Sequence, residues 1–146
     1  MVAEFRLITA DEFETQLADN PDLRAELIDG MVVVSPEPTY LHQFIGPRLF
    51  ETLQPIASSQ RLGYWFNPVN LRLSEFNVFH PDLAFFRFED RPKLRGASSP
   101  SLPTIVVEIL SPSSKSRDLR HKRIRYAEAE IAEYWVIDQD RNSIVI

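Results

Sequence analysis

One apolar stretch, residues 104–110, constrains the fold of this chain more than any other part of the sequence. It reads TIVVEIL and is rich in β-branched side chains. A continuous run of this kind is typical of a strand that is buried on both faces of its sheet. The stretch therefore predicts a central strand, and one charged residue, Glu108, lies inside it.

Glu108 has a counterpart in Asp82, which opens a second apolar run at residues 82–88. A buried carboxylate without a partner is costly in free energy. Either carboxylate alone is best interpreted as a salt bridge or as the cap of a strand end. Two carboxylates on neighbouring strands repel each other unless a cation lies between them, and Mg²⁺ or Mn²⁺ prefers such oxygen ligands. The pair therefore favours a metal site formed by Asp82 and Glu108.

The segment that follows these strands, residues 118–130, is predicted to be a helix, and it carries Lys122. Leu119, Lys122 and Tyr126 are spaced i, i+3 and i+7, so they share one face of the helix. Leu119 and Tyr126 should pack on the sheet, which also directs Lys122 toward it. The alternative is that Lys122 extends along the helix to its solvent-exposed rim.

The chemistry that fits these three groups is phosphodiester hydrolysis. Metal held by Asp82 and Glu108 would polarise the phosphate and lower the pKa of a bound water. Lys122 would orient that water or stabilise the charge that develops on the phosphorus centre. The net charge of −5 argues against tight sequence-independent DNA binding, but residues 115–125 are locally basic. The basic residues expected to meet phosphate are Lys115, Arg117, Arg120 and Arg123.

Two helices are predicted in the first half of the chain. Thr9 and Glu12 have the spacing of a capping box, which indicates a helix over residues 10–18. The second helix is expected over residues 40–58, with Pro47 as a site for a kink. Its apolar residues recur at helical spacing and predict one buried stripe. The stripe consists of Leu41, Phe44, Ile45, Leu49, Leu53 and Ile56.

Asp29 and Gly30 separate two apolar runs, residues 26–28 and 31–34. An Asp-Gly pair in this context predicts a β-hairpin, because a type I′ turn needs positive φ at both central residues. A surface loop is expected over residues 89–103, which are rich in proline and serine. Further strands are predicted over residues 64–66, 69–73, 133–138 and 143–146.

The length of 146 residues indicates a single domain, residues 1–146. Cysteine is absent, which excludes disulfides and thiolate metal sites. No apolar run approaches the ~18 residues of a membrane span, and we expect a cytoplasmic protein. The chain stops inside an apolar run at residues 143–146. We therefore expect either a truncated C-terminus or a strand edge that is paired in a homodimer.

Several of these residues resemble the PD-(D/E)XK nuclease superfamily. Pro81 and Asp82 match the first half of its motif, and Glu108 matches the acid of the second half. Leu110 stands where the motif has lysine, and Lys122 matches the position to which some members move that lysine. More narrowly, the chain resembles the Uma family of putative restriction endonucleases. The matching stretches are residues 26–30, His42, Pro81-Asp82, residues 107–113, Lys122 with Tyr126, and residues 133–138.

The resemblance implies a restriction-endonuclease-like α+β (α/β) core, in which helices flank a central mixed sheet. It also implies a Mg²⁺-dependent endonuclease acting on DNA. Glu26 and His42 match positions near the active centre, with Glu26 as a further catalytic carboxylate and His42 and Tyr126 as accessory residues. Glu26 is about as well explained as a charge at a strand edge, and His42 as a helix-face histidine bonded to a neighbour. The alternative function is a catalytically inactive module of the same fold that binds nucleic acid or protein.

Overall fold

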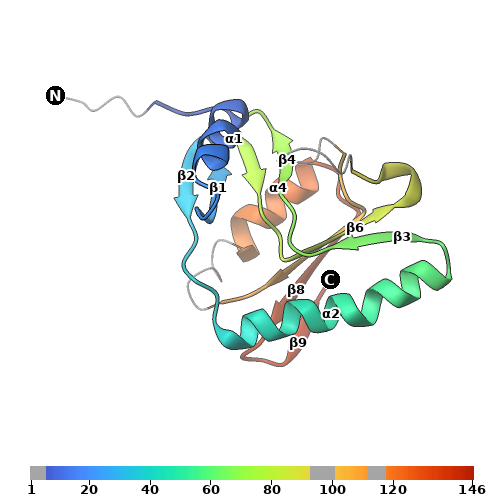
Figure 1. Ribbon diagram of the computed structural model, residues 1–146. Coiled ribbons are helices and arrows are strands. Elements are labelled where there is room, and N and C mark those ends of the chain that lie inside the picture. The colour runs from blue at the N-terminus through green and yellow to red at the C-terminus, as the bar shows by residue number, and fades with distance from the viewer. Residues whose placement is uncertain (1–5, 93–100, 112–117) are drawn as a thin grey trace.

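The strands form two sheets in the computed structural model, which describes residues 6–92, 101–111 and 118–146 (Figure 1). One sheet has four antiparallel strands in the order β2-β1-β5-β4. The other has five strands in the order β3-β6-β7-β8-β9, and it is mixed because β7 and β8 run parallel. The predicted α+β class with a mixed sheet is confirmed, and a second, antiparallel sheet lies beside the mixed one.

The four-stranded sheet begins with the predicted hairpin of β1 (Ala25–Ile28) and β2 (Met31–Val34). Asp29 and Gly30 have φ angles of 51° and 77°, as a type I′ turn requires. The sheet is completed by β4 (Leu71–Ser74) and β5 (Asn77–Phe79). The sequence analysis did not predict β5, which has only three residues.

The five-stranded sheet has β7 (Ile105–Ile109) at its centre, as the apolar stretch predicts. Its neighbours are β6 (Leu83–Arg87), which is antiparallel to it, and β8 (Glu133–Asp138). The outer strands are β3 (Gly63–Phe66) and β9 (Ser143–Val145). Because β7 is covered on both sides, its residues 106–109 are all buried.

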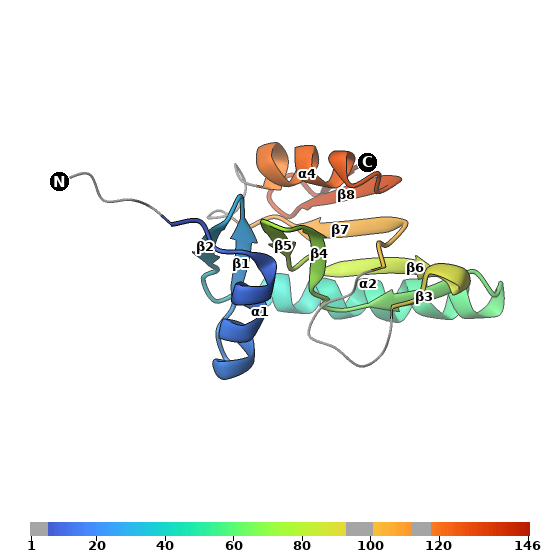
Figure 2. The same cartoon turned by 90° about the horizontal axis from the view of Figure 1, so that it is seen from above.

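Two helices lie on opposite faces of the five-stranded sheet (Figure 2). On one face runs α2 (Tyr40–Ser59), which starts at the cap residue Thr39. On the other face lies the segment predicted as one helix, which consists of a π-helical turn, η2 (Asp118–Lys122), and α4 (Arg123–Glu128). The first helix, α1 (Ala10–Asp19), begins at the predicted capping box and packs on the four-stranded sheet. A short 3₁₀ helix, η1 (Phe88–Asp90), follows β6.

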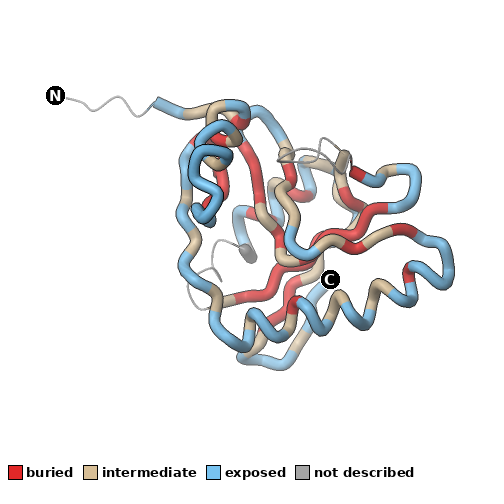
Figure 3. Tube along the Cα trace, in the orientation of Figure 1, coloured by how far each residue is buried: buried red, intermediate tan, exposed pale blue. Residues whose placement is uncertain are grey.

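The expected buried stripe of α2 is wrong in part. Ile45, Leu49 and Leu53 pack on the sheet, but Leu41, Phe44 and Ile56 are exposed. The fully buried residues of this helix are Gly46 and Ala57. The helix thus packs on the sheet through a face that includes Gly46 and Ala57, and part of the apolar stripe is turned toward solvent (Figure 3).

The two sheets share one hydrophobic core. Leu71 and Phe79 of the four-stranded sheet pack with Phe86 and Val106 of the five-stranded sheet and with Tyr126 of α4. A second cluster fills the space between α2 and the five-stranded sheet. Among the residues that the structure describes, no helix combines the length and apolar character that a membrane crossing requires.

Candidate active site

Asp82 and Glu108 meet where β6 and β7 lie side by side. Leu83 pairs with Val107 in this antiparallel ladder, so the next position of the same register sets Asp82 opposite Glu108. The sequence analysis expects Asp82 inside a strand, but β6 begins one residue later because the Asp82 side chain caps the neighbouring strand. Its Oδ2 accepts the backbone N–H of Ile109 at 2.7 Å.

His42 reaches the same carboxylate from α2, on the other face of the sheet. Its Nε2 lies 3.2 Å from Asp82 Oδ1, and both side chains are mostly buried. Asp82 is therefore held through both oxygens, by a backbone amide at one and an imidazole at the other. This contact fits the alternative interpretation of His42 as a helix-face histidine bonded to a neighbour, and it also places His42 at the site.

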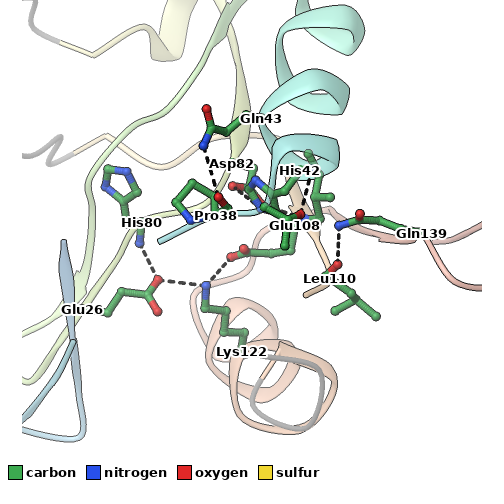
Figure 4. Close-up of polar contacts among 12 residues, drawn as sticks. Glu26, Pro38, His42, Gln43, His80, Asp82, Glu108, Leu110, Lys122 and Gln139 are labelled. Atoms are coloured by element: carbon green, nitrogen blue, oxygen red, sulfur yellow. Dashed lines mark hydrogen bonds and ion pairs between the residues drawn. The ribbon is translucent and has the colours of Figure 1, made fainter. Parts of the chain in front are cut away.

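Lys122 lies between two carboxylates and is only 3% exposed. Its Nζ is 2.7 Å from Glu108 Oε1 and 2.8 Å from Glu26 Oε1 (Figure 4). The inward direction predicted for Lys122 is confirmed, and the solvent-exposed alternative is wrong. The lysine thus links β1 of one sheet, through Glu26, to β7 of the other.

Tyr126 donates a second hydrogen bond to Glu108, from its hydroxyl to the same Oε1, at 2.7 Å. Burial, followed by the nearby carboxylates of Glu108 and Glu26, raises the pKa of Tyr126 well above its usual value. The phenol therefore stays protonated and remains a donor. Two donors on one oxygen fix the orientation of the Glu108 carboxylate.

Glu26 lies in β1 and is almost fully buried, which excludes the interpretation of a charge exposed at a strand edge. Besides binding Lys122, its Oε1 accepts the backbone N–H of His80 at 2.8 Å. The His80 ring bonds Asn70, with 2.5 Å between Nδ1 and Oδ1. Burial lowers the pKa of His80, against the opposing effect of Glu26, so the imidazole is neutral near pH 7.

These side chains line a pocket of about 80 Å³, which we call the carboxylate pocket. This volume is enough for an ion with a few water-sized ligands. The ionised residues of its lining are the carboxylates Glu26, Glu37, Asp82 and Glu108 and the cations Arg24 and Lys122. With four carboxylates against two cations, the pocket is formally negative, which favours a cation and disfavours a bare phosphate.

The donor set suits Mg²⁺ or Mn²⁺, both of which prefer carboxylate oxygens. In the described parts of the chain, no three His, Cys, Asp or Glu side chains are arranged to enclose a metal ion. Mg²⁺ commonly uses one or two carboxylates and completes its shell with waters and substrate phosphates. Asp82 and Glu108 fit that arrangement.

The structure brings most of the predicted site residues together. Asp82, Glu108, Lys122, Glu26 and His42 line the carboxylate pocket, and the hydroxyl of Tyr126 contacts Glu108 behind it.

The predicted nucleic-acid contacts are only partly described. Arg120 and Arg123 are exposed and lie outside the pocket lining. Lys115 and Arg117 lie outside the described residues.

Sequence analysis missed one functional candidate, Arg24, and gave His80 little weight. Arg24 is an exposed arginine directly before β1, and no motif or periodicity marks it. His80 lies between β5 and β6, and the sequence analysis does not place it at the site. Its place two residues before Asp82 was the available signal that it would lie near the site.

Leu110, which stands where the superfamily motif has lysine, is buried beyond the end of β7. The amine of Lys122 nevertheless reaches Glu108, from the helical segment rather than from the strand. Lys122 therefore supplies an amine beside Glu108, and its equivalence to the lysine of the motif stays a prediction.

Comparison with known proteins gives a matching family and similar solved structures. Residues 10–146 match the family model Uma2, described as a putative restriction endonuclease. A putative nuclease of the DUF820 group from Anabaena variabilis has a similar crystal structure, with a TM-score of 0.72 at 20% identity. The similarity covers 94% of this chain and 77% of the other, and it shows a shared fold. None of the curated proteins compared with the chain matches it.

Proposed function

This chain belongs to the Uma2 family of putative restriction endonucleases, and from that membership we propose that it is a metal-dependent endonuclease that hydrolyses phosphodiester bonds of DNA. The family and the similar solved structure support a nuclease role in general. Metal dependence and DNA as the substrate are the specific parts of the proposal.

The observation that carries the proposal is the pairing of Asp82 and Glu108 across β6 and β7, in a negative pocket that also holds the Lys122 amine. A pocket of this charge attracts a divalent cation, and the cation then makes it able to receive an anionic phosphate. The same two carboxylates without an added cation would repel a nucleic acid backbone.

Asp82 and Glu108 would hold Mg²⁺ or Mn²⁺, which supplies Lewis-acid polarisation of the phosphate and lowers the pKa of bound water. The protein's own part is to keep the two carboxylates in place. The Ile109 N–H and His42 hold Asp82, while Tyr126 and Lys122 hold Glu108. Lys122 also adds positive charge to the pocket wall, where negative charge develops as the phosphodiester reacts.

Arg120 and Arg123, with Lys115 and Arg117, are proposed to contact the phosphate backbone around the cut. A homodimer would bring two such sites to the two strands of a duplex, because a closed two-fold assembly presents its sites symmetrically.

The test is calorimetric titration of Mg²⁺ or Mn²⁺, with and without DNA, together with cleavage of DNA. We expect Asp82→Asn and Glu108→Gln to lose saturable metal binding. DNA cleavage should fall by more than about 100-fold, because the loss of a residue that only supports a metal ligand already costs up to about 100-fold. Surface substitutions of the same type, Asp90→Asn and Glu51→Gln, should leave both measurements unchanged.

Circular dichroism of each variant would show whether the fold persists. Metal binding that survives in both site variants would contradict the assignment of the ligands. A wild-type protein that binds no divalent ion, even with DNA present, would favour the catalytically inactive module.

A further inference from the structure

A second cavity lies next to the carboxylate pocket, and we call it the side cavity. It has a volume of about 270 Å³, compared with about 80 Å³ for the carboxylate pocket. Its walls come from the end of α1 and from the turn that leads into β1. Asn70, just before β4, and His80, just after β5, complete it. Figure 2 shows α1, β1, β4 and β5 on the same side of the molecule.

The two cavities share part of their lining, namely Arg24, Ala25 and His80. They lie on either side of β1, because Ala25 packs toward α1 while Glu26 contacts Lys122. A ligand that occupied both cavities would pass Arg24, directly before the first residue of β1. The exposed guanidinium of Arg24 lies at this junction, where it can pair with an anionic group of the ligand.

The chemistry of the side cavity differs from that of its neighbour. No carboxylate lines it, and Arg24 is its one ionised side chain among the described residues. Leu17, Ala18, Pro21 and Leu23 give it apolar walls. A cavity of this kind suits an uncharged, flat group, whereas the carboxylate pocket suits a cation and a phosphate.

Part of the lining of the side cavity is polar. Asn70 and His80 line it and hydrogen-bond to each other, with 2.5 Å between Asn70 Oδ1 and His80 Nδ1. A nucleobase has apolar faces and a polar edge. Imidazole rings offer a stacking surface for such faces, and amide side chains are common partners for such edges.

We propose that the side cavity is a nucleoside-binding subsite, which receives a base next to the phosphate held in the carboxylate pocket, with Arg24 between the two. The proposal rests on the proposed nuclease function for its substrate class. It adds that the protein recognises a nucleotide through the base as well as through the phosphate backbone.

A pair of matched ligands tests this proposal. Thymidine 5′-monophosphate and 2-deoxyribose 5-phosphate carry the same sugar and phosphate, but the second ligand has no base. Neither has a phosphodiester bond, so an endonuclease does not consume them. Calorimetric titration in the presence of Mg²⁺ should show that the thymidine nucleotide binds at least about tenfold more tightly, within the range of one stacked base.

The variant Ala18→Trp fills the side cavity from an exposed position of α1. It should reduce binding of the thymidine nucleotide to the level of 2-deoxyribose 5-phosphate, and should leave binding of the latter unchanged. The matched control is Ala127→Trp, an exposed alanine of α4 that lines neither cavity. Leu23→Ala, which shortens an apolar wall, should lower the preference for the base in the same direction.

Three results would overturn the proposal: equal binding of the two ligands, no binding of either, or an equal loss of both in Ala18→Trp. A DNA cleavage assay separates this proposal from the nuclease assignment. Preferential nucleotide binding without any cleavage would retain the subsite and remove the catalytic function. Cleavage combined with equal binding of the two ligands would do the reverse.

Discussion

Lys122 is the residue on which the arrangement of the site most depends, because its amine contacts Glu26 and Glu108 in a buried environment. Replacement by methionine keeps much of the volume but leaves two buried carboxylates without their cation. We expect Lys122→Met to lower the free energy of unfolding by about 3–5 kcal/mol, as measured by urea denaturation.

An exposed ion pair provides the control for this prediction. Arg48 pairs with Glu51 on the surface of α2, and its side chain is 64% exposed. Arg48→Met should change the free energy of unfolding by less than about 1 kcal/mol. Equal effects of the two substitutions would mean that the buried contacts of Lys122 do not hold the two carboxylates in the folded state.

The buried phenol of Tyr126 should make the free energy of unfolding depend on pH in the alkaline range. Burial raises its pKa above the value in the unfolded chain, so the stability that the neutral phenol contributes is present below pH ~10 and is lost as the pH rises further. Tyr126→Phe removes the hydrogen bond to Glu108 and should cost about 1.5–3 kcal/mol at neutral pH. The difference from wild type should shrink above pH ~10, when urea denaturation is repeated there.

Tyr40 is the comparison residue, because it is 92% exposed. Tyr40→Phe should match the wild type within about 0.5 kcal/mol at both pH values. If the difference between Tyr126→Phe and wild type stayed constant with pH, the phenol would not be the group that titrates.

Asp82, Glu108 and Lys122 were predictable from sequence because each breaks an apolar pattern. A charge inside a buried strand or on the inward face of a helix must have a partner. Lys122 pairs with Glu108, and Asp82 lies beside His42. Arg24 breaks no pattern, since an exposed arginine before a strand is ordinary. Its place between the two cavities arises only when α1, β1 and β5 are packed together.

At the scale of the elements, an added methyl group should have opposite effects on stability at Gly30 and at Gly46. Gly30 has a φ of 77°, and an added Cβ would lie 2.8 Å from Leu7 Cβ. Gly46 lies within α2, and its added Cβ would meet only ordinary contacts, the nearest being Ile109 Cδ1 at 3.7 Å. We expect Gly30→Ala to destabilise the protein by more than about 1 kcal/mol, and Gly46→Ala to stabilise it by about 0.5–1 kcal/mol.

Thermal or urea unfolding of both variants measures these changes, and each variant serves as the control for the other. The same sign for both would contradict the explanation. A loss of stability in Gly46→Ala in particular would show that α2 cannot accept a methyl group against the sheet, despite the space around Gly46.

Local sequence signals predicted the elements whose ends carry capping or turn residues. The capping box at Thr9 and the turn at Asp29 and Gly30 both lie where the sequence indicates. β5 has only three residues and no turn signal strong enough to separate it from its surroundings. The buried face of α2 was misplaced because spacing alone cannot show that Gly46 and Ala57 face the sheet.

At the scale of the whole molecule, the site depends on the contact between the two sheets. Glu26 comes from the four-stranded sheet, and Glu108 from the five-stranded sheet. The amine of Lys122 joins them, and the shared core packs around Tyr126. The family resemblance implies a mixed sheet, but the division of the strands into two sheets depends on long-range packing that no local pattern records.

The charge of the whole chain leads to the last prediction. The net charge is −5, and the pocket itself is negative, so DNA should bind weakly when no divalent ion is present. Divalent cations ordinarily compete with a protein for phosphates and weaken DNA binding. Here we expect Ca²⁺, which also binds carboxylate oxygens, to strengthen the association by at least about tenfold, as measured by fluorescence anisotropy of a labelled duplex.

Asp82→Asn should abolish this strengthening, while Asp90→Asn on the surface should retain it. Raising the concentration of monovalent salt separates the two contributions, because salt weakens contacts of Arg and Lys with phosphate but does not remove a cation held by two carboxylates. If Ca²⁺ weakens binding in the wild type, the basic residues would account for the affinity. In that case the carboxylate pocket would not hold the DNA backbone, because a cation bound in the pocket should attract the phosphate and raise the affinity for DNA.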